Sequence, residues 1–334
     1  MLRLRHLKMA SRFVTHRLRE IHVFEVQAVL LNACNLRCAY CCCPEIKTRL
    51  MTTAQWIDVI QGLARVGTMR IKFQGGEPTL RRDFDDLCAE TQRNGILAAV
   101  ITNGLEVAKR PTLLDHLDEV VFSLDSVTPE INDRLRGPDT HAQVVAAIDM
   151  ARQRGLPTYV NMVVTRDNLD ELEPMLEFCE ARNVGLNAQP VLFGTEFYDA
   201  AARHLALTTE QIRDMHRRLA TWKRHGRGVM FSAPIYEKIV NWPDHDVLAT
   251  RTAGTSDCMA GKYYIHIAAN GDVHPCVQHN ASLTPKNIVA DGLEEALRHV
   301  QRHDCGDCFM GYLNERKAVF SFKPTALREL ILRG

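Results

Sequence analysis

The stretch "VFEVQAVLLNACNLRCAYCCC", residues 23–43, joins an apolar run to a dense group of thiols. Its first part, Val23–Leu31, is rich in apolar and β-branched residues and predicts a buried strand. Five cysteines follow within ten residues, from Cys34 to Cys43. A strand that leads directly into this loop places the thiols at its carboxyl end, where α/β folds gather their functional residues.

Strands and helices alternate from this point to residue 193. Apolar runs predict further strands at 71–76, 96–104, 119–126, 157–165 and 185–193. Helical periodicity predicts intervening helices at 52–67, 81–95, 111–117, 141–155 and 169–183, the first opened by a Thr52/Gln55 capping box. This pattern predicts a parallel sheet with right-handed crossovers. Because six units are fewer than the eight of a closed barrel, we expect an α/β fold with a partial (β/α)6 TIM-like barrel.

The alternation stops after residue 193. Thr208 and Gln211 form a second capping box and predict a helix that ends near Gly226. Asn270-Gly271, flanked by short β-like runs, predicts a hairpin. The expected division is a basic amphipathic segment at 1–22, the partial barrel at 23–226, and a small hairpin-plus-helix domain at 227–334.

Composition restricts the partners. The net charge of +1 supplies no global field to recruit nucleic acid, and no apolar run is long enough to span a membrane. Residues 1–22 hold six basic side chains and one acid, Glu20. This segment predicts either weak contact with an anionic membrane surface or a helix that covers the base of the barrel. It lacks the apolar core of a secretory signal, so we expect a cytoplasmic protein.

The thiols form two groups at opposite ends of the chain. In a reducing compartment, clustered cysteines bind metals or perform catalysis more often than they form disulfides. Cys34, Cys38 and Cys41 have the spacing C-x3-C-x2-C. Three thiolates can hold three irons of a [4Fe–4S] cube and leave the fourth iron open. A structural zinc site is the alternative, with Cys42 or Cys43 as the fourth ligand.

The second group contains four cysteines. Cys258 and Cys276 flank the predicted hairpin, and Cys305 and Cys308 form a C-x2-C pair after a predicted helix. The hairpin and the helix would bring these thiols together. Four thiolates suit either structural zinc or a fully ligated cube, and spacing alone favours zinc.

The first group and its surroundings resemble the radical S-adenosylmethionine (SAM) superfamily. The resemblance is carried by "CNLRCAYC" at the end of the first strand and by "GGEP" at Gly75–Pro78 after the next strand. It implies that Cys34, Cys38 and Cys41 hold a [4Fe–4S] cluster whose open iron chelates SAM. One electron then cleaves SAM to a 5′-deoxyadenosyl radical, which takes a hydrogen atom from the substrate. An electron donor such as flavodoxin or ferredoxin is implied as a partner.

The same resemblance implies roles for the SAM-binding residues. Tyr40 would pack near the cluster and adenine. The SAM ammonium would be received by Gly75, Gly76 and Glu77. Ser123 and Asp125 would hold the ribose hydroxyls, and Arg136 would bind the carboxylate. Asn103 and Asn161 would also line the site. Cys42 and Cys43 depart from the family pattern, and we expect either packing roles or donation of a hydrogen atom to a substrate radical.

The second group resembles the Twitch (shortened SPASM) extension, which is typical of radical SAM enzymes with an auxiliary [4Fe–4S] cluster. The segment "CMAGKYYIHIAANGDVHPC" and the later cysteine pair carry this resemblance. It favours an enzyme that oxidises or epimerises a polar small molecule such as a sugar, aminocyclitol or glycosyl lipid. The alternative is a maturase of a ribosomally made peptide, which forms a thioether or epimerises a residue. Because Cys34 leaves no room ahead of the barrel for a peptide-docking domain, we expect the small-molecule substrate.

Overall fold

The protein, described by a computed structural model, forms a mixed α/β fold built on one parallel sheet. The described residues are 15, 20–192, 198, 200–250, 258–277, 283–303 and 306–321. Six parallel strands pair in chain order: β1 (Glu25–Leu31), β2 (Arg70–Gly75), β3 (Leu97–Thr102), β4 (Glu119–Ser123), β5 (Thr158–Val164) and β6 (Gly185–Pro190). The predicted partial barrel is therefore confirmed. The segment 1–22 lies almost entirely outside the described residues.

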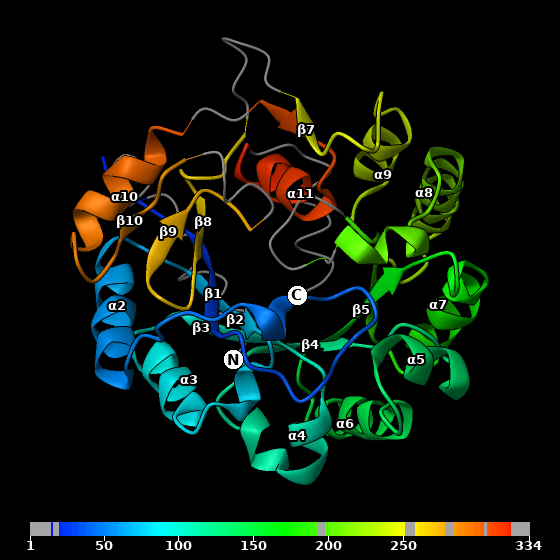
Figure 1. The fold of residues 1–334 in the computed structure, drawn as a ribbon, viewed down its shortest axis with the longest axis horizontal. Helices are drawn as coiled ribbons and strands as arrows, with labels where there is room; N and C mark the ends of the chain where they lie inside the picture. Colours follow the sequence, from blue (N-terminus) through cyan, green and yellow to red (C-terminus); the bar gives the residue numbers. More distant parts are fainter. Residues whose placement is uncertain are drawn as a thin grey trace.

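Helices form an arc outside the strands (Figure 1). Those that follow β1 to β6 are α2 (Thr53–Arg65), α3 (Phe84–Arg93), α4 (Leu105–Lys109), α5 (Pro129–Arg136), α6 (His141–Gln153), α7 (Leu172–Ala181) and α8 (Thr209–Arg224). Both predicted capping boxes are present, at Thr52 and at Thr208. The helix expected at 111–117 is instead a short 3-10 turn, Pro111–Leu114. Nowhere in the described ranges is there a helix long and apolar enough to cross a membrane.

Each strand directs alternate side chains to opposite faces. On β2, Phe73 is fully buried and packs edge-on against Phe84 of α3, 6.2 Å between ring centroids. Its neighbours Lys72 and Gln74 lie on the other face, toward the inside of the barrel, where Lys72 pairs with Glu119. The outward face thus forms the apolar core with the helices, and the inward face carries polar groups that can meet a ligand.

The C-terminal third continues the same sheet. Its elements are α9 (Ala233–Val240), β7 (Ala249–Thr250), β8 (Tyr264–Ile267), β9 (Asp272–His274), β10 (Lys286–Asn287), α10 (Leu293–Gln301), β11 (Asp307–Cys308) and α11 (Gly311–Phe320). β8 pairs parallel with β1, and β9 and β10 extend the sheet to nine strands. The predicted hairpin around Gly271, whose φ is +94°, is confirmed. The division at residue 227 stays a prediction, since one sheet runs across it.

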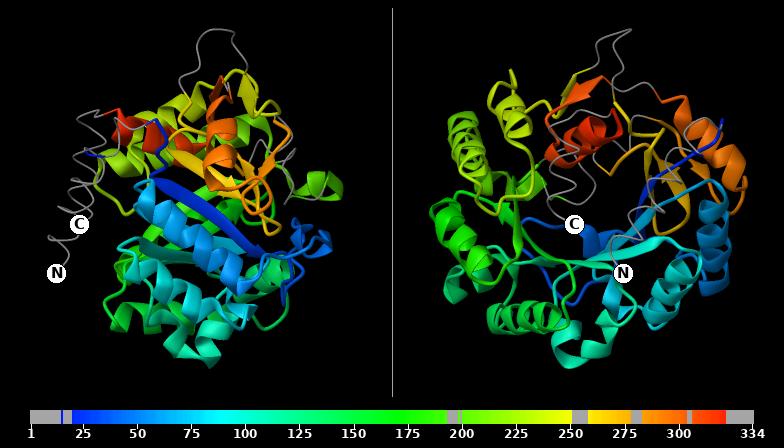
Figure 2. Two further views of the ribbon diagram at one scale, coloured as in Figure 1. Left: turned by 90° about the vertical axis from the view of Figure 1, so that its left-hand side faces the viewer. Right: turned by 180° about the vertical axis from the view of Figure 1, so that it is seen from behind.

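The two C-terminal helices, α10 and α11, contact the barrel at different places. α10 lies beside α2 (Figures 1 and 2), and a Cβ added to Gly62 of α2 would lie 3.1 Å from Leu293 Cδ2 of α10. α11 lies inside the ring, near β8 and α9 (Figure 1). The Tyr312 hydroxyl donates to Glu25 of β1 at 2.6 Å, and Arg316 Nε pairs with the same carboxylate at 3.2 Å. The helix is therefore fixed to the base of the barrel by polar contacts.

Arg70 is the centre of this buried ionic group. Its guanidinium pairs with Glu25 and with Glu119, both at 2.8 Å. Burial raises the pKa of Glu119, but Lys72 and Arg70 outweigh it and hold that pKa at about 2. The ion pairs thus stabilise the ionised carboxylate in the folded protein.

We expect Arg70→Gln to lower the free energy of unfolding by about 3–5 kcal/mol, because it leaves two buried carboxylates without their shared cation. Since the folded-state pKa of Glu119 is depressed, its contribution is present above the usual pKa of 4.5 and is lost as pH falls toward about 2. The variant should therefore lose less stability than the parent between those values. Urea unfolding at several pH values measures this, and parallel acid slopes in the two proteins would contradict it.

Candidate functional site

The cysteine loop after β1 opens onto one cavity at the carboxyl ends of the strands. We call this the cysteine-loop cavity. It encloses about 170 Å³, and most of the predicted residues line it: Cys34, Cys38, Tyr40, Cys41, Cys43, Gly75, Gly76, Glu77, Asn103, Ser123, Arg136 and Asn161. Residues of the cysteine loop, of β2 to β5 and of α5, up to more than 100 positions apart, are thus brought to one place.

The three thiols of the C-x3-C-x2-C spacing are close enough to influence one another. Burial raises the pKa of Cys41 to about 11, and the neighbouring Cys38 and Cys34 add to the rise. Burial also raises the pKa of Cys34 and of Cys38. Metal binding must therefore displace protons from these thiols. Within the described ranges, no group of three or more Cys, His, Asp or Glu side chains is placed so that it could hold a single metal ion. The spacing of Cys34, Cys38 and Cys41 fits a multi-iron cluster with one open iron, and Cys43 also lines the cavity.

The two glycines of "GGEP" permit a close approach of β2 to the cysteine loop. Gly76 N–H donates to Leu31 O at 2.8 Å, and Glu77 N–H donates to Ala33 O at 2.9 Å. A Cβ on Gly76 would lie 2.2 Å from Ala33 O, and one on Gly75 would lie 2.1 Å from Leu31 O. The side-chain-free segment therefore fixes where the cysteine loop begins.

We expect Gly76→Ala to push the cysteine loop away from β2, because the new methyl group overlaps backbone oxygens that cannot move independently. Iron content after anaerobic reconstitution should fall by roughly half or more if one of two four-iron clusters is lost. Gly228→Ala is the matched control for a general effect of removing glycine, since the nearest atom to its added Cβ is Glu180 Cγ at 3.5 Å, an ordinary van der Waals contact. Full iron incorporation in Gly76→Ala would contradict this role.

Glu77 is a fully buried carboxylate that holds the ends of β2 and β3 together. It accepts from the hydroxyls of Thr79 at 2.6 Å and Thr102 at 2.8 Å, and from Asn103 N–H at 2.7 Å. Burial raises its pKa despite these bonds. Asn103 Nδ2 in turn donates to Asn35 Oδ1 of the cysteine loop at 2.7 Å. Glu77 and Asn103 therefore position the loop as well as line the cavity.

Asp125 lies behind the cavity and not in its lining. Its side chain is fully buried and bonds to Tyr40 and Arg136. Ser123 does line the cavity and pairs in register with Asn161 of β5. Of the expected ribose pair, the structure thus brings Ser123 alone to the cavity.

The extra thiols of the loop differ in position. Cys43 is buried, lines the cavity, and has its Sγ 3.8 Å from Asn32 O. Cys42 is half-buried and is not part of the lining.

Among the lining residues that were not expected from the sequence are Tyr198 and Gln74. Tyr198 forms an isolated antiparallel bridge with Cys41, and its ring centroid lies 6.0 Å from that of Tyr40. No periodic pattern surrounds Tyr198, so no sequence signal indicated it. Gln74 immediately precedes "GGEP" on β2, and its inward position follows from strand alternation.

The second cysteine group is only partly described. Cys258 and Cys276 share an apolar cluster with Ala260 and Tyr264. Burial raises the pKa of Cys308 to about 12, and nearby Cys258 adds to the rise. Cys305 lies outside the described residues. The structure thus brings three of the four predicted ligands into one region, and their assignment stays a prediction.

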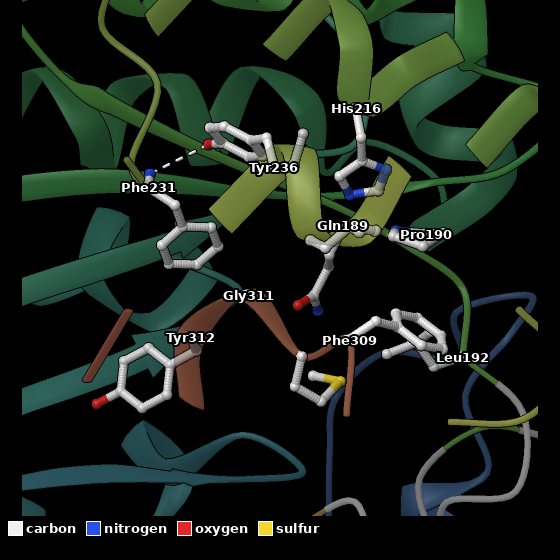
Figure 3. A pocket seen from close by; sticks show the side chains of 12 residues that line it. Gln189, Pro190, Leu192, His216, Phe231, Tyr236, Phe309, Gly311 and Tyr312 are labelled. Carbon is white, nitrogen blue, oxygen red and sulfur yellow. Dashed lines mark hydrogen bonds between the residues drawn. The ribbon is translucent and has the colours of Figure 1, made fainter. Parts of the chain in front are cut away.

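A second, smaller cavity lies between β6, α8, α9 and the start of α11. Its walls include the rings of Phe231, Tyr236 and Phe309, and Gln189 points into it (Figure 3). Burial lowers the pKa of His216, at its upper edge in this view, to about 4, so the imidazole is neutral near pH 7. Gln189 Nε2 also lies 3.5 Å from the Tyr198 hydroxyl. This contact places the second cavity next to the cysteine-loop cavity.

Solved structures share this fold. Streptococcus suis SuiB bound to its precursor peptide SuiA has a TM-score of 0.67 at 16% identity, over 93% of this chain and 76% of that chain. A structure titled anSMEcpe with bound AdoMet has a TM-score of 0.65 at 16% identity, over 91% of this chain and 98% of that chain. At this identity the likeness concerns the fold alone.

Curated relatives share sequence as well. The PqqA peptide cyclase of Gluconobacter oxydans (strain 621H) is 28% identical over 77% of this chain and 70% of its own length. That of Rhizobium meliloti (strain 1021) is 27% identical over 82% of this chain and 72% of its own. The model of the radical SAM superfamily matches residues 29–179, which span β1 through most of α7 and include the cysteine loop. Residues 29–179 therefore match the radical SAM superfamily, and this match together with the curated relatives supports a radical SAM enzyme that uses a [4Fe–4S] cluster and SAM.

Proposed function

We propose that this protein modifies a peptide by forming a cross-link between two of its residues. The observation that carries the proposal is the sequence similarity to PqqA peptide cyclases, which extends over 77–82% of this chain in the two relatives described above. The fold shared with SuiB, solved with its precursor peptide, is consistent with it.

The expected substrate class was wrong. Cysteine spacing in the C-terminal extension favoured oxidation or epimerisation of a sugar, aminocyclitol or glycosyl lipid. The curated relatives are peptide cyclases instead, and they match over 75–82% of this chain. The peptide maturase, first considered as the alternative, is the reading that these relatives favour.

In this proposal Cys34, Cys38 and Cys41 hold the cluster, whose open iron supplies SAM binding and the electron for SAM cleavage. Arg136 would bind the SAM carboxylate through a charge-assisted hydrogen bond. Its Nε is buried and has no hydrogen-bond partner among the described residues. The backbone at Gly75, Gly76 and Glu77 would receive the ammonium, and Ser123 would bind the ribose.

The inner face of the barrel offers neutral amides to a peptide. Gln74 and Asn161 line the cysteine-loop cavity. Asn187 Nδ2 donates to Asn161 Oδ1 at 2.6 Å, while Asn187 Oδ1 is buried with no partner within the described part of the chain. A buried acceptor without a donor costs about 1–3 kcal/mol. A backbone N–H of the peptide would satisfy it.

Cross-linking two residues removes two hydrogen atoms from the peptide. The radical takes one, and the second leaves as a proton and an electron. The second cysteine group (Cys258, Cys276, Cys305 and Cys308) would hold an auxiliary [4Fe–4S] cluster that supplies the acceptor for this electron. An external donor such as flavodoxin or ferredoxin would supply the first electron. Cys43, beside the cavity, would donate hydrogen only if the product were an epimer.

The test supplies reconstituted enzyme with SAM, reductant and a panel of candidates. The peptides are PqqA, SuiA and those encoded by short reading frames beside the gene. Sugars and aminocyclitols form the second arm. We expect one peptide to stimulate 5′-deoxyadenosine formation and to become lighter by two hydrogen atoms. Turnover of a sugar or aminocyclitol, with every peptide inert, would overturn the proposal.

A further inference from the structure

We propose that Asp125 is a positioning residue that holds the cysteine loop against the end of α5 through Tyr40 and Arg136. We call these three residues the loop clamp. This inference rests on the proposed assignment of Cys38 and Cys41 as cluster ligands, but not on the identity of the substrate. It differs from the ribose role that the sequence resemblance implied for Asp125.

Tyr40 connects the loop to the clamp. It lies between Cys38 and Cys41 in the chain and is only 4% exposed. Its hydroxyl donates to Asp125 Oδ2 at 2.5 Å and accepts from Arg136 Nη1 at 2.9 Å. Because the hydroxyl is bonded to a buried anion and a buried cation, moving Tyr40 would leave both with fewer partners.

Asp125 is itself held from several directions. Its Oδ1 accepts from Val163 N–H of β5 at 2.9 Å. Its backbone N–H donates to Asn132 Oδ1 of α5 at 3.1 Å, and its backbone carbonyl accepts from Asn168 Nδ2 at 2.7 Å. The carboxylate therefore offers a fixed anchor, with Oδ2 left to Tyr40 and Arg136. Both oxygens are engaged within the protein, and the fully buried side chain is not part of the cavity lining where a ribose would bind.

The end of α5 holds the same loop through the backbone. Ala39 N–H donates to Leu135 O at 2.8 Å, one residue before Arg136. Leu36 Cδ2 would lie 3.2 Å from a Cβ added to Gly137, so the loop also packs on the turn that ends α5. The clamp and this backbone contact together hold the segment that carries Cys38 and Cys41 against α5.

Arg136 belongs both to the loop clamp and to the lining of the cysteine-loop cavity. Nη1 is shared by Asp125 at 3.2 Å and Tyr40 at 2.9 Å, and Arg136 also lines the cavity. An anion bound by the remaining N–H groups would thus touch the same guanidinium that holds the loop. Asp125 also balances the charge of Arg136 when no anion is present.

The test uses the metal-free protein, so that it is independent of cluster activity. Site-resolved alkylation of Cys38 and Cys41 by iodoacetamide is followed by mass spectrometry. Tyr40→Phe keeps the ring and removes the hydroxyl, and we expect alkylation to become roughly tenfold faster. Faster amide hydrogen exchange at Ala39 should accompany it. Tyr263→Phe, on a ring that packs against Phe24 at the base of the barrel, is the matched control and should change neither rate.

A double-mutant cycle separates the clamp from general loosening. If Asp125 acts through Tyr40, Asp125→Asn should accelerate alkylation as Tyr40→Phe does, and the double variant should be no faster than the faster single variant. Unchanged alkylation in Tyr40→Phe, or fully additive effects, would overturn the inference. If Asp125→Asn fails to fold, Tyr40→Phe alone decides. Failure of peptide modification would leave these rates unaffected, so the two proposals fail separately.

Discussion

Replacing Cys34 with alanine is expected to abolish reductive cleavage of SAM. The variant keeps two of the three proposed cluster ligands, Cys38 and Cys41, and two are too few to hold a cube with one open iron. Anaerobic assays should find no 5′-deoxyadenosine above background. Iron content should fall from about eight to about four atoms per chain if the auxiliary cluster remains.

Cys88→Ala is the control for this experiment. Cys88 is 1% exposed and lies in the core on α3, away from the cavity lining. We expect it to cost about 1–2 kcal/mol of stability and to leave SAM cleavage intact. If Cys34→Ala cleaved SAM at the parent rate, the assignment of the cluster ligands would be wrong.

Replacing Cys276 with alanine should uncouple the two halves of the reaction. The cysteine-loop cavity contains none of the described residues of the second cysteine group. SAM cleavage without substrate should therefore persist, while peptide cross-linking should stop because the second electron has no acceptor. The measurement compares 5′-deoxyadenosine with cross-linked peptide in one reaction.

The matched control is Cys179→Ala, which removes a fully buried thiol from α7. It should retain both activities at a modest cost in stability. Cross-linking by Cys276→Ala at the parent rate would argue against an auxiliary redox role. Loss of both activities in a folded Cys276→Ala variant would contradict the expected uncoupling, because it would show that SAM cleavage also needs the second group.

The fold was predictable where local signals were strong. Alternation of apolar runs with capped helices indicated the six parallel strands, and Thr52 and Thr208 begin their helices as their capping boxes predict. The short helix Leu105–Lys109 was missed because it has five residues and opens at a glycine. The pairing of β8 with β1 was missed because its partners lie more than 200 residues apart, and hydrophobic patterns do not specify distant pairings.

The candidate site divides in the same way. Motif spacing indicated Cys34, Cys38 and Cys41, which line one cavity as expected. The position of Asp125 was not predictable. Asp125 lies just beyond the end of β4, and its carboxylate bonds to Tyr40 and Arg136 instead of lining the cavity. Tyr198 reaches the cavity from a segment after β6 that has no periodic pattern.

The substrate class could not be predicted from the sequence, for a different reason. The number of residues ahead of Cys34 was used against a peptide substrate. That count concerns a docking module and not the chemistry of the barrel. The proposed peptide contacts of Gln74, Asn161 and Asn187 were not predictable either, because the convergence of these amides is a property of the folded sheet.

The most direct test of the central claim is electron paramagnetic resonance of the reduced, anaerobically reconstituted protein with and without SAM. If Cys34, Cys38 and Cys41 hold a cluster with an open iron, SAM should change the spectrum of one [4Fe–4S] centre. The change should be absent in Cys34→Ala and present in Cys88→Ala. A reduced spectrum that SAM leaves unaltered in the parent protein would contradict the account.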